Sequence, residues 1–220
     1  MILFENVSKS YEIHKFQKQV LNNLSFQINR GESIGICGAN GAGKSTLVRM
    51  MAGIEAPTSG KITRTMKTSW PMGYASAFVP SLTGADNVRF MARVYDKPEE
   101  ELLAKVEEFA ELGAYMHQPM NTYSAGMGAR LAFGVSLNIR FECYLVDEVT
   151  AAGDERFRRK CEEGLMERRN ESTLIMISHD SGTLRQYCER GAVLYAGTLA
   201  FFDSIEEACE IHHGLQALNS

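Results

Sequence analysis

The stretch GANGAGKST, residues 38–46, constrains this chain more than any other feature of the sequence. Gly38 and Gly43 stand five positions apart, and Lys44 and Ser45 follow at once. Glycine lets the main chain turn tightly enough for successive N–H groups to point inward at one anion. A helix that begins near Lys44 would add its positive N-terminal end to the same place. The stretch therefore predicts a loop that holds phosphate.

The segments on either side of the loop supply the strand and the helix that such a loop requires. Residues 32–37 are β-rich, and residues 44–53 have a helical pattern that ends at a glycine. Lys44 would offer a charge to the β- and γ-phosphates, and the Ser45 hydroxyl suits Mg²⁺. The anion is thus predicted to be a nucleoside triphosphate. The loop residues expected to hold it are Gly38, Ala39, Asn40, Gly41, Ala42, Gly43, Lys44, Ser45 and Thr46.

The charge balance argues against a nucleic-acid partner. The chain has 220 residues with 23 basic and 27 acidic side chains, a net charge of −4, and no basic cluster stands out. Nucleic-acid binding domains need a concentrated positive surface. With 45% hydrophobic residues, the chain is long enough for one large domain or for a domain with a subdomain.

The cysteines and the apolar segments indicate an intracellular protein that does not cross a membrane. The five cysteines are scattered, odd in number and without a C-x-x-C pair, so we expect reduced, buried thiols and no zinc site. The N-terminus has an early acid and lacks the apolar core of a signal peptide. The longest uncharged stretch, residues 68–85, contains two prolines and two glycines and is not expected to span a bilayer.

The hydrophobic pattern predicts a mixed α/β core with a helical subdomain at about residues 82–137. The core is expected to contain the phosphate loop, and a charged helix at 154–169 is expected between two of its strands. The expected strands are 2–7, 20–28, 32–37, 60–64, 143–148, 172–180 and a hairpin at 191–203, and the expected helices of the subdomain are 82–95, 98–112 and one beginning at Ser124.

Two of the core strands end in side chains suited to phosphate chemistry. Asp147 and Glu148 close the apolar strand CYLVDE, and their side chains point to different sides, so one can support Mg²⁺ while the other faces a water. His179 follows another apolar strand, at the end where parallel α/β sheets bind ligands. The alternatives are an acidic pair at the surface and a structural histidine. Beside Lys44, the catalytic interpretation is favoured.

The stretch YSAGMGAR decides the class of phosphate protein. Ser124 is a good N-cap, and Gly126 allows close approach of another main chain. With the motifs around it, the stretch resembles the L-S-G-G-Q signature of ABC ATPases, although Tyr123, Ala125 and Met127 depart from that pattern. The resemblance extends along the chain in the family's order: phosphate loop, signature, Asp-Glu strand, Asp154 in AAGD, then His179.

The resemblance implies roles for these residues. The fold would be a P-loop NTPase of the ABC type over residues 1–220, and the chain would hydrolyse ATP as a head-to-tail homodimer. Lys44, Glu148 and His179 would be catalytic, and Ser45 and Asp147 would support Mg²⁺. Tyr11 falls where the family places a ring that stacks on adenine, and the alternative is a tyrosine at a strand edge. The other predicted nucleotide contacts are Ser124, Gly126 and Asp154.

The similarity narrows to one branch of the family. The segments SWP, SLTGADNVRF, FAELG, YSAGM and YLVDEVTAAGDERF look like those of the ATP-binding subunits of Gram-negative capsular polysaccharide exporters. This implies a peripheral protein at the cytoplasmic face of the inner membrane, with an integral permease as its partner and contact with polysaccharide only through that permease. Export of O-antigen or teichoic acid is one alternative. A soluble regulatory ABC ATPase is another.

One family feature is missing from the sequence. ABC domains commonly place a glutamine where the core meets the helical subdomain, and Val79 stands there in this chain. A valine side chain has no hydrogen-bond donor or acceptor. Either Ser45 and Asp147 with waters complete the Mg²⁺ shell, or basal turnover is low until the permease orders the site.

Overall fold

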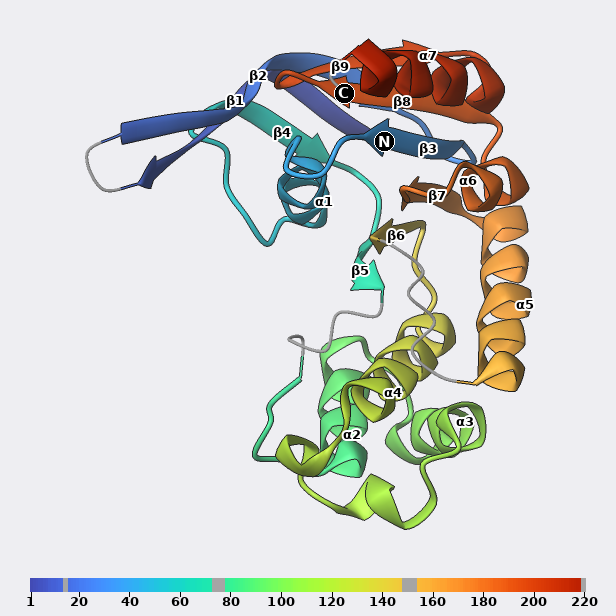
Figure 1. Cartoon of the computed structure of the whole chain (residues 1–220). Coiled ribbons are helices and arrows are strands. Elements are labelled where there is room, and N and C mark those ends of the chain that lie inside the picture. The colour runs from blue at the N-terminus through green and yellow to red at the C-terminus, as the bar shows by residue number, and fades with distance from the viewer. Residues whose placement is uncertain (14–15, 73–77, 148–153, 219–220) are drawn as a thin grey trace. The chain divides into compact units, whose positions relative to one another are not determined.

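Strand β3 (Ser33–Gly38), which leads into the phosphate loop, lies inside a six-stranded sheet with the order β5-β6-β7-β3-β8-β9 (Figure 1). It runs parallel to β7 and β8, and β9 runs antiparallel to β8. All six of its residues are buried, which explains its unbroken apolar pattern. The other strands of this sheet are β5 (Thr68–Met72), β6 (Cys143–Asp147), β7 (Thr173–Ile177), β8 (Arg190–Tyr195) and β9 (Thr198–Phe202).

Alternating side chains of β3 face different helices. Ile34 and Ile36 belong to the apolar core that also contains residues of α1 (Lys44–Ala52). Gly35 faces the other way, where an added Cβ would lie 2.6 Å from Ile205 Cδ1. Ile205 begins α7 (Ile205–Leu218), which covers that side of the sheet together with α6 (Ser181–Tyr187). The phosphate loop therefore leaves a strand that is packed on both faces.

A second, antiparallel sheet has the order β2-β1-β4, with β1 (Ile2–Ile13), β2 (Phe16–Ile28) and β4 (Ser59–Arg64). The first two strands are longer than the sequence predicted. Their outer halves pair with each other, as Ser10 with Gln19 and Tyr11 with Lys18. The main chains of these residues pair with each other across the hairpin. Because the residues form no apolar face, the alternation of apolar and polar residues did not predict these parts of the strands.

Two elements of the sheet region were not predicted. Strand β5 contains Pro71, which disfavours a central strand, but β5 is at the edge of its sheet, where proline is tolerated. Helix α6 has only seven residues, and Asp180 caps it by accepting hydrogen bonds from the amides of Gly182 and Thr183. The predicted hairpin β8–β9 is confirmed, with positive φ at both turn residues, Ala196 and Gly197.

The chain divides into two units, and the structure is a computed structural model that describes residues 1–13, 16–72, 78–147 and 154–218. We call Met1–Pro71, Phe141–Glu148 and Arg169–Ser220 the core unit, and Met72–Arg140 with Val149–Arg168 the helical unit. Both sheets belong to the core unit, apart from Met72 at the end of β5. The helical unit includes all of the predicted helical stretch at 82–137 and adds most of the charged helix.

The helical unit is built on α2 (Gly84–Val94), α3 (Glu99–Ala110) and α4 (Ala125–Asn138), with two short 3₁₀ helices, Gly113–His117 and Met120–Thr122. Gly134 brings α4 against α3, since its added Cβ would lie 3.3 Å from Val106 and Phe109. Helix α5 (Glu155–Glu171) packs Gly164 against Leu137 in the same way. From Arg169 on, its last residues belong to the core unit.

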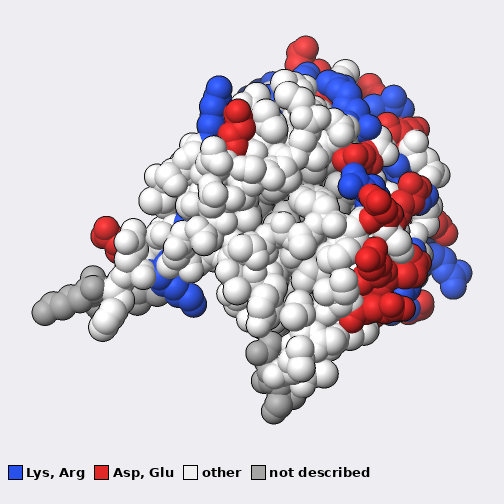
Figure 2. All heavy atoms as spheres, turned by 90° about the horizontal axis from the view of Figure 1, so that it is seen from above, with Lys and Arg blue, Asp and Glu red and all other residues white. Residues whose placement is uncertain are grey.

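The surface and the cysteines complete the description. Seen from above, acidic and basic side chains crowd together along one side, and no single sign dominates there (Figure 2). Within the core unit, for example, Arg190 lies 3.0 Å from Glu32. The five cysteines are free and buried, as predicted, and burial is the main cause that raises the pKa of Cys37 to about 12. Among the described residues, no helix is long and apolar enough to cross a bilayer.

Candidate functional site

The phosphate loop has the main-chain geometry that its glycines predicted. Gly41 and Gly43 have φ of +78° and +105°, values that L side chains rarely adopt. The amide of Ala42 donates to Ala39 O at 3.1 Å and closes the turn. At Gly38 the constraint is space, because an added Cβ would lie 2.8 Å from the carbonyl oxygen of Leu194. The loop therefore depends on glycine for two different reasons.

Lys44 begins helix α1 and folds back over the loop. Its Nζ donates to the carbonyl oxygens of Gly38 and Ala39 at 2.7 and 2.9 Å. The ammonium group thus lies at the loop, next to the N-terminal end of α1. Ser45 is exposed, whereas the hydroxyl of Thr46 is buried and turned toward Tyr11, 3.1 Å away. Only the main chain of Thr46 remains suited to phosphate.

Strand register brings three predicted groups to one edge of the sheet. Asp147 ends β6 opposite Ile177 of β7, and Ile177 is in turn opposite Ile36 of β3. His179 follows Ile177 by two residues, as Gly38 follows Ile36. These strands are parallel, so their carboxyl ends meet at the same edge. His179 is exposed and Asp147 is partly buried there. The predicted general base Glu148 lies outside the described residues.

Tyr11 lies next to helix α1, but its hydroxyl is engaged. It donates to Glu55 Oε1 at 2.5 Å and accepts from Arg49 Nη2 at 3.2 Å. The ammonium of Lys9 lies 5.1 Å from the centre of the ring. Sequence reasoning selected Tyr11 and missed Glu55, Arg49 and Lys9. The signal available in the sequence was the charge of Glu55, two residues after the helix stop at Gly53, and this charge does not show which residues pair with it.

The signature stretch is confirmed as a helix start. The Ser124 hydroxyl accepts a hydrogen bond from the amide of Met127 at 3.2 Å and caps α4. Gly126 is open, since within the described part of the chain an added Cβ would meet only Ser124 Oγ, at 3.9 Å. A pocket of about 200 Å³ lies at this helix end. It is lined by Phe78, Pro80, Met120, Tyr123, Ser124, Ala125 and Gly128.

Asp154 stabilises the start of α5 through hydrogen bonds. Its carboxylate accepts from the amide of Phe157 at 2.9 Å and from Arg130 Nη2 at 3.0 Å. The hydrogen bond from Phe157 is the main cause that lowers the pKa of Asp154, and Arg130 adds to it. Arg130 also lies over the ring of Phe157, 4.5 Å from its centre. Asp154, a predicted nucleotide contact, is therefore an ionised carboxylate fixed by two hydrogen bonds within the helical unit.

Val79, at the place of the missing glutamine, is 43% exposed. Its main chain is held by Asn87 of α2, which is only 1% exposed. Sequence reasoning missed Asn87. An asparagine inside an amphipathic helix is a weak signal of such a role. Its side chain competes with the helical hydrogen bonds, so asparagine is not favoured there for the helix alone.

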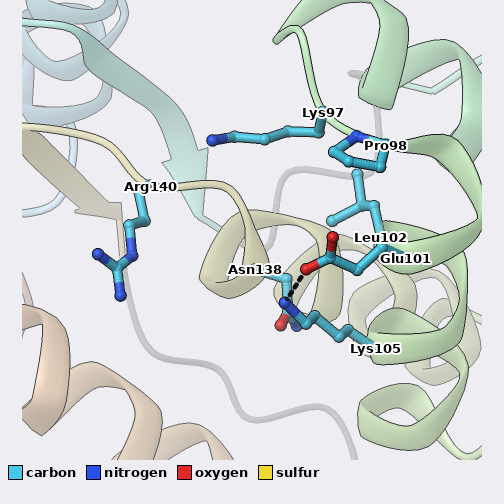
Figure 3. A pocket seen from close by; sticks show the side chains of 7 residues that line it. All are labelled: Lys97, Pro98, Glu101, Leu102, Lys105, Asn138 and Arg140. Carbon is cyan, nitrogen blue, oxygen red and sulfur yellow. Dashed lines mark hydrogen bonds and ion pairs between the residues drawn. The ribbon is translucent and has the colours of Figure 1, made fainter.

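A larger pocket, of about 360 Å³, lies within the helical unit (Figure 3). Lys105 pairs with Glu101 at 2.6 Å along α3, and Lys97 and Arg140 extend into the same region. None of its lining residues is a predicted site residue. The residues are Lys97, Pro98, Glu101, Leu102, Lys105, Asn138 and Arg140.

Comparisons with known proteins show what the whole chain is similar to. The family model described as ABC transporter matches residues 21–151. The chain is 46% identical to the capsule polysaccharide export ATP-binding protein CtrD of Neisseria meningitidis serogroup B, over 98% of this chain and 100% of that protein. It is 43% identical to the polysialic acid transport ATP-binding protein KpsT of Escherichia coli, over 100% of this chain and 99% of that protein.

More distant matches bear on the alternatives and on the fold. The teichoic acids export ATP-binding protein TagH of Bacillus cereus is 32% identical over 94% of this chain, which corresponds to 41% of that protein. A dimeric post-hydrolysis structure of the ATP-binding cassette MJ0796 with ADP and Pi is 22% identical, with a TM-score of 0.78 over 92% of this chain and 98% of that one. The latter similarity confirms the predicted fold.

Proposed function

The chain belongs to the ABC transporter family of ATP hydrolases, and we propose that it powers the export of capsular polysaccharide through a separate permease. The observation that carries the nucleotide part is the register that brings Gly38, Asp147 and His179 to one sheet edge beside Lys44. The choice of cargo rests on the relatives that act in capsule and polysialic acid export.

The residues of the core unit fit Mg²⁺-ATP. The positive φ values of Gly41 and Gly43 give the loop a turn that other residues would strain. The exposed Ser45 hydroxyl and the Asp147 carboxylate are hard oxygen ligands. Mg²⁺ needs only one or two such ligands, because phosphates and water supply the rest. Bound there, the ion would neutralise charge on the β- and γ-phosphates.

Each side chain then has a separate task in hydrolysis. Lys44 exchanges its loop carbonyls for phosphate oxygens and stabilises their charge. Glu148 accepts a proton from the attacking water. His179, exposed at the end of β7, donates to the γ-phosphate as charge develops. Tyr11 presents its ring to adenine.

We further propose that two copies form a head-to-tail dimer with shared sites. The phosphate loop belongs to the core unit, and the Ser124 cap with Gly126 belongs to the helical unit. Each ATP would lie between Lys44 of one subunit and Ser124 of the partner subunit, with Asp154 near the join. Gly126 supports this arrangement, since among the described residues only Ser124 Oγ, at 3.9 Å, comes near the position of its missing Cβ. Closure on ATP and reopening after hydrolysis would drive the permease.

Gene deletion tests the export role. Loss of the chain should trap the capsule polymer in the cytoplasm, and the intact gene should restore export whereas Lys44→Ala should not. Normal surface capsule in the deletion strain would overturn the cargo assignment and favour O-antigen or teichoic acid export. Co-purification with an integral membrane protein tests the permease partner, as well as the proposed position at the cytoplasmic face of the inner membrane. A soluble regulatory ATPase would lack that partner.

A further inference from the structure

A cluster of four polar side chains surrounds the hydroxyl of Tyr11. The hydroxyl contacts Glu55 at 2.5 Å, Thr46 at 3.1 Å and Arg49 at 3.2 Å. Lys9 completes the cluster, with its Nζ 2.9 Å from Glu55 Oε1 and 5.1 Å from the centre of the tyrosine ring. All of these residues belong to the core unit. We call this set the Tyr11 cluster.

Glu55 is the centre of the Tyr11 cluster. Its two carboxylate oxygens accept hydrogen bonds from Lys9 Nζ at 2.9 Å, from Arg49 Nε at 2.9 Å and from the Tyr11 hydroxyl. The Glu55 side chain is 17% exposed, so two cations compensate one poorly hydrated carboxylate. Burial raises the pKa of Glu55, but the hydrogen bonds from Tyr11, Lys9 and Arg49 outweigh it and lower the pKa to about 2. The carboxylate is therefore charged at neutral pH.

The Tyr11 cluster connects β1 to both ends of helix α1. Thr46 is the last residue of the phosphate loop and lies in the first turn of α1, and Arg49 lies three residues further on the same face. Glu55 follows the helix, just after Gly53 ends it. The phenol ring is thus fixed at its hydroxyl end to the helix that carries the phosphate-binding amides.

Lys9 also restricts the ring from the side. Its ammonium lies over the ring and donates to the carbonyl oxygen of Ala56 at 2.9 Å. A cation above an aromatic ring is attracted to it and occupies that side. An adenine base would then have to use the remaining exposed surface of Tyr11, which is only partly buried.

We infer that Glu55 is a positioning residue for nucleotide recognition. With Lys9 and Arg49 it holds the Tyr11 ring at a fixed position relative to the phosphate loop, so that base and phosphates are recognised as one unit. The inference rests on the proposed role of Tyr11 in adenine stacking. Holding a side chain in its bound arrangement before binding avoids the cost of ordering it, which corresponds to a roughly two- to tenfold gain in affinity.

The test compares two ligands that share phosphates and differ in the base. The affinities of the full chain for Mg-ADP and for Mg-pyrophosphate are measured by titration and by competition. Glu55→Gln keeps the shape and removes the charge, and Tyr11→Phe keeps the ring and removes the hydroxyl. Each substitution should weaken the affinity for Mg-ADP about two- to tenfold and leave the affinity for Mg-pyrophosphate unchanged. The matched control is Glu32→Gln, because Glu32 is 21% exposed and pairs with Arg190 at 3.0 Å elsewhere in the core unit.

Tyr11→Ala separates this inference from the stacking role. If Tyr11→Ala weakens the binding of Mg-ADP but Glu55→Gln and Tyr11→Phe do not, the positioning role of Glu55 is overturned and the stacking role of Tyr11 is retained. If Tyr11→Ala leaves Mg-ADP unchanged, both are overturned, whereas the phosphate loop is untouched. Equal weakening of both ligands by Glu55→Gln would show an effect on α1 as a whole and would also overturn the inference. Tyr11→Phe keeps every charge of the cluster and provides the test if Glu55→Gln fails to fold.

Discussion

The side-chain amide of Asn87 makes two hydrogen bonds to the main chain of Val79. It accepts from the Val79 N–H at 2.8 Å and donates to the Val79 C=O at 3.1 Å. The same nitrogen donates to Thr83 O at 2.9 Å, one turn back along the chain. The residue at the place of the missing glutamine is thus fixed through its main chain, while its own side chain stays half exposed. We therefore expect that mechanical coupling through this segment needs no polar side chain at Val79.

Asn87→Ala should destabilise the helical unit by about 1 to 3 kcal/mol, because it removes the acceptor of the Val79 N–H and one of the two donors to each of the carbonyl oxygens of Val79 and Thr83. Urea unfolding measures this loss. Asn138→Ala is the control, since Asn138 makes one hydrogen bond, to Gly134 O at 2.8 Å, and is less buried. Equal losses in the two variants would contradict a special role for Asn87.

Val79→Gln should change the ATPase rate of the isolated chain by less than about tenfold, or under about 1.4 kcal/mol on the barrier. The reason is that Asn87 already holds the segment and that waters complete a Mg²⁺ shell readily. Steady-state phosphate release measures the rate. A larger gain would show that the missing amide limits hydrolysis. Loss of export with intact ATPase activity would place Val79 at the permease contact.

Glu148→Gln should bind Mg-ATP yet hydrolyse it at least about a hundredfold more slowly, because an amide cannot accept the proton of the attacking water. ATP binding is measured by titration and turnover by phosphate release. Asp203→Gln is the control, since Asp203 is an exposed acid of the core unit that pairs with Arg190 at 3.7 Å. Turnover close to that of the wild type would remove Glu148 from the mechanism.

A mixed dimer tests whether sites are shared. When Lys44→Ala on one subunit is combined with Ser124→Arg on the other, one composite site carries both defects and the second carries neither. We expect the tagged heterodimer to retain more ATPase activity than either mutant homodimer, up to about half of the wild type if the sites act independently. Activity no higher than that of the homodimers would contradict sharing.

The ionised Glu55 should stabilise the core unit in a pH-dependent way. Its pKa is about 2 in the folded chain against an ordinary value of 4.5, so the unfolded chain takes up the proton first as the pH falls. The stabilisation is complete above about pH 4.5 and is lost as the pH falls toward 2. The difference between the urea midpoints of the wild type and Glu55→Gln should be nearly the same at pH 7 and pH 5, clearly smaller at pH 3, and should vanish only as the pH falls below about 2. A constant gap would count against the Glu55 hydrogen bonds as its source.

Local spacing in the sequence determined the nucleotide motifs. The positions of Gly38, Gly43 and Lys44 require a tight turn followed by a helix, and the structure has α1 beginning at Lys44. The Ser124 cap is equally local, because a hydroxyl bonds to an amide three residues later. Such features involve neighbours along the chain, so their physical causes are visible in a short stretch of residues.

Tertiary structure decided which distant residues meet. Only the strand order shows that β7 lies between β6 and β3, where Asp147 pairs with Ile177, two residues before His179. Pairing across an outer hairpin lengthened β1 and β2 beyond what their polar residues indicated. Glu55 reaches Tyr11 across 44 positions, a contact that no periodicity encodes. Contacts of this kind exist only after the chain has buried its core and returned on itself, and their energy depends on an exclusion of water that the sequence alone does not display.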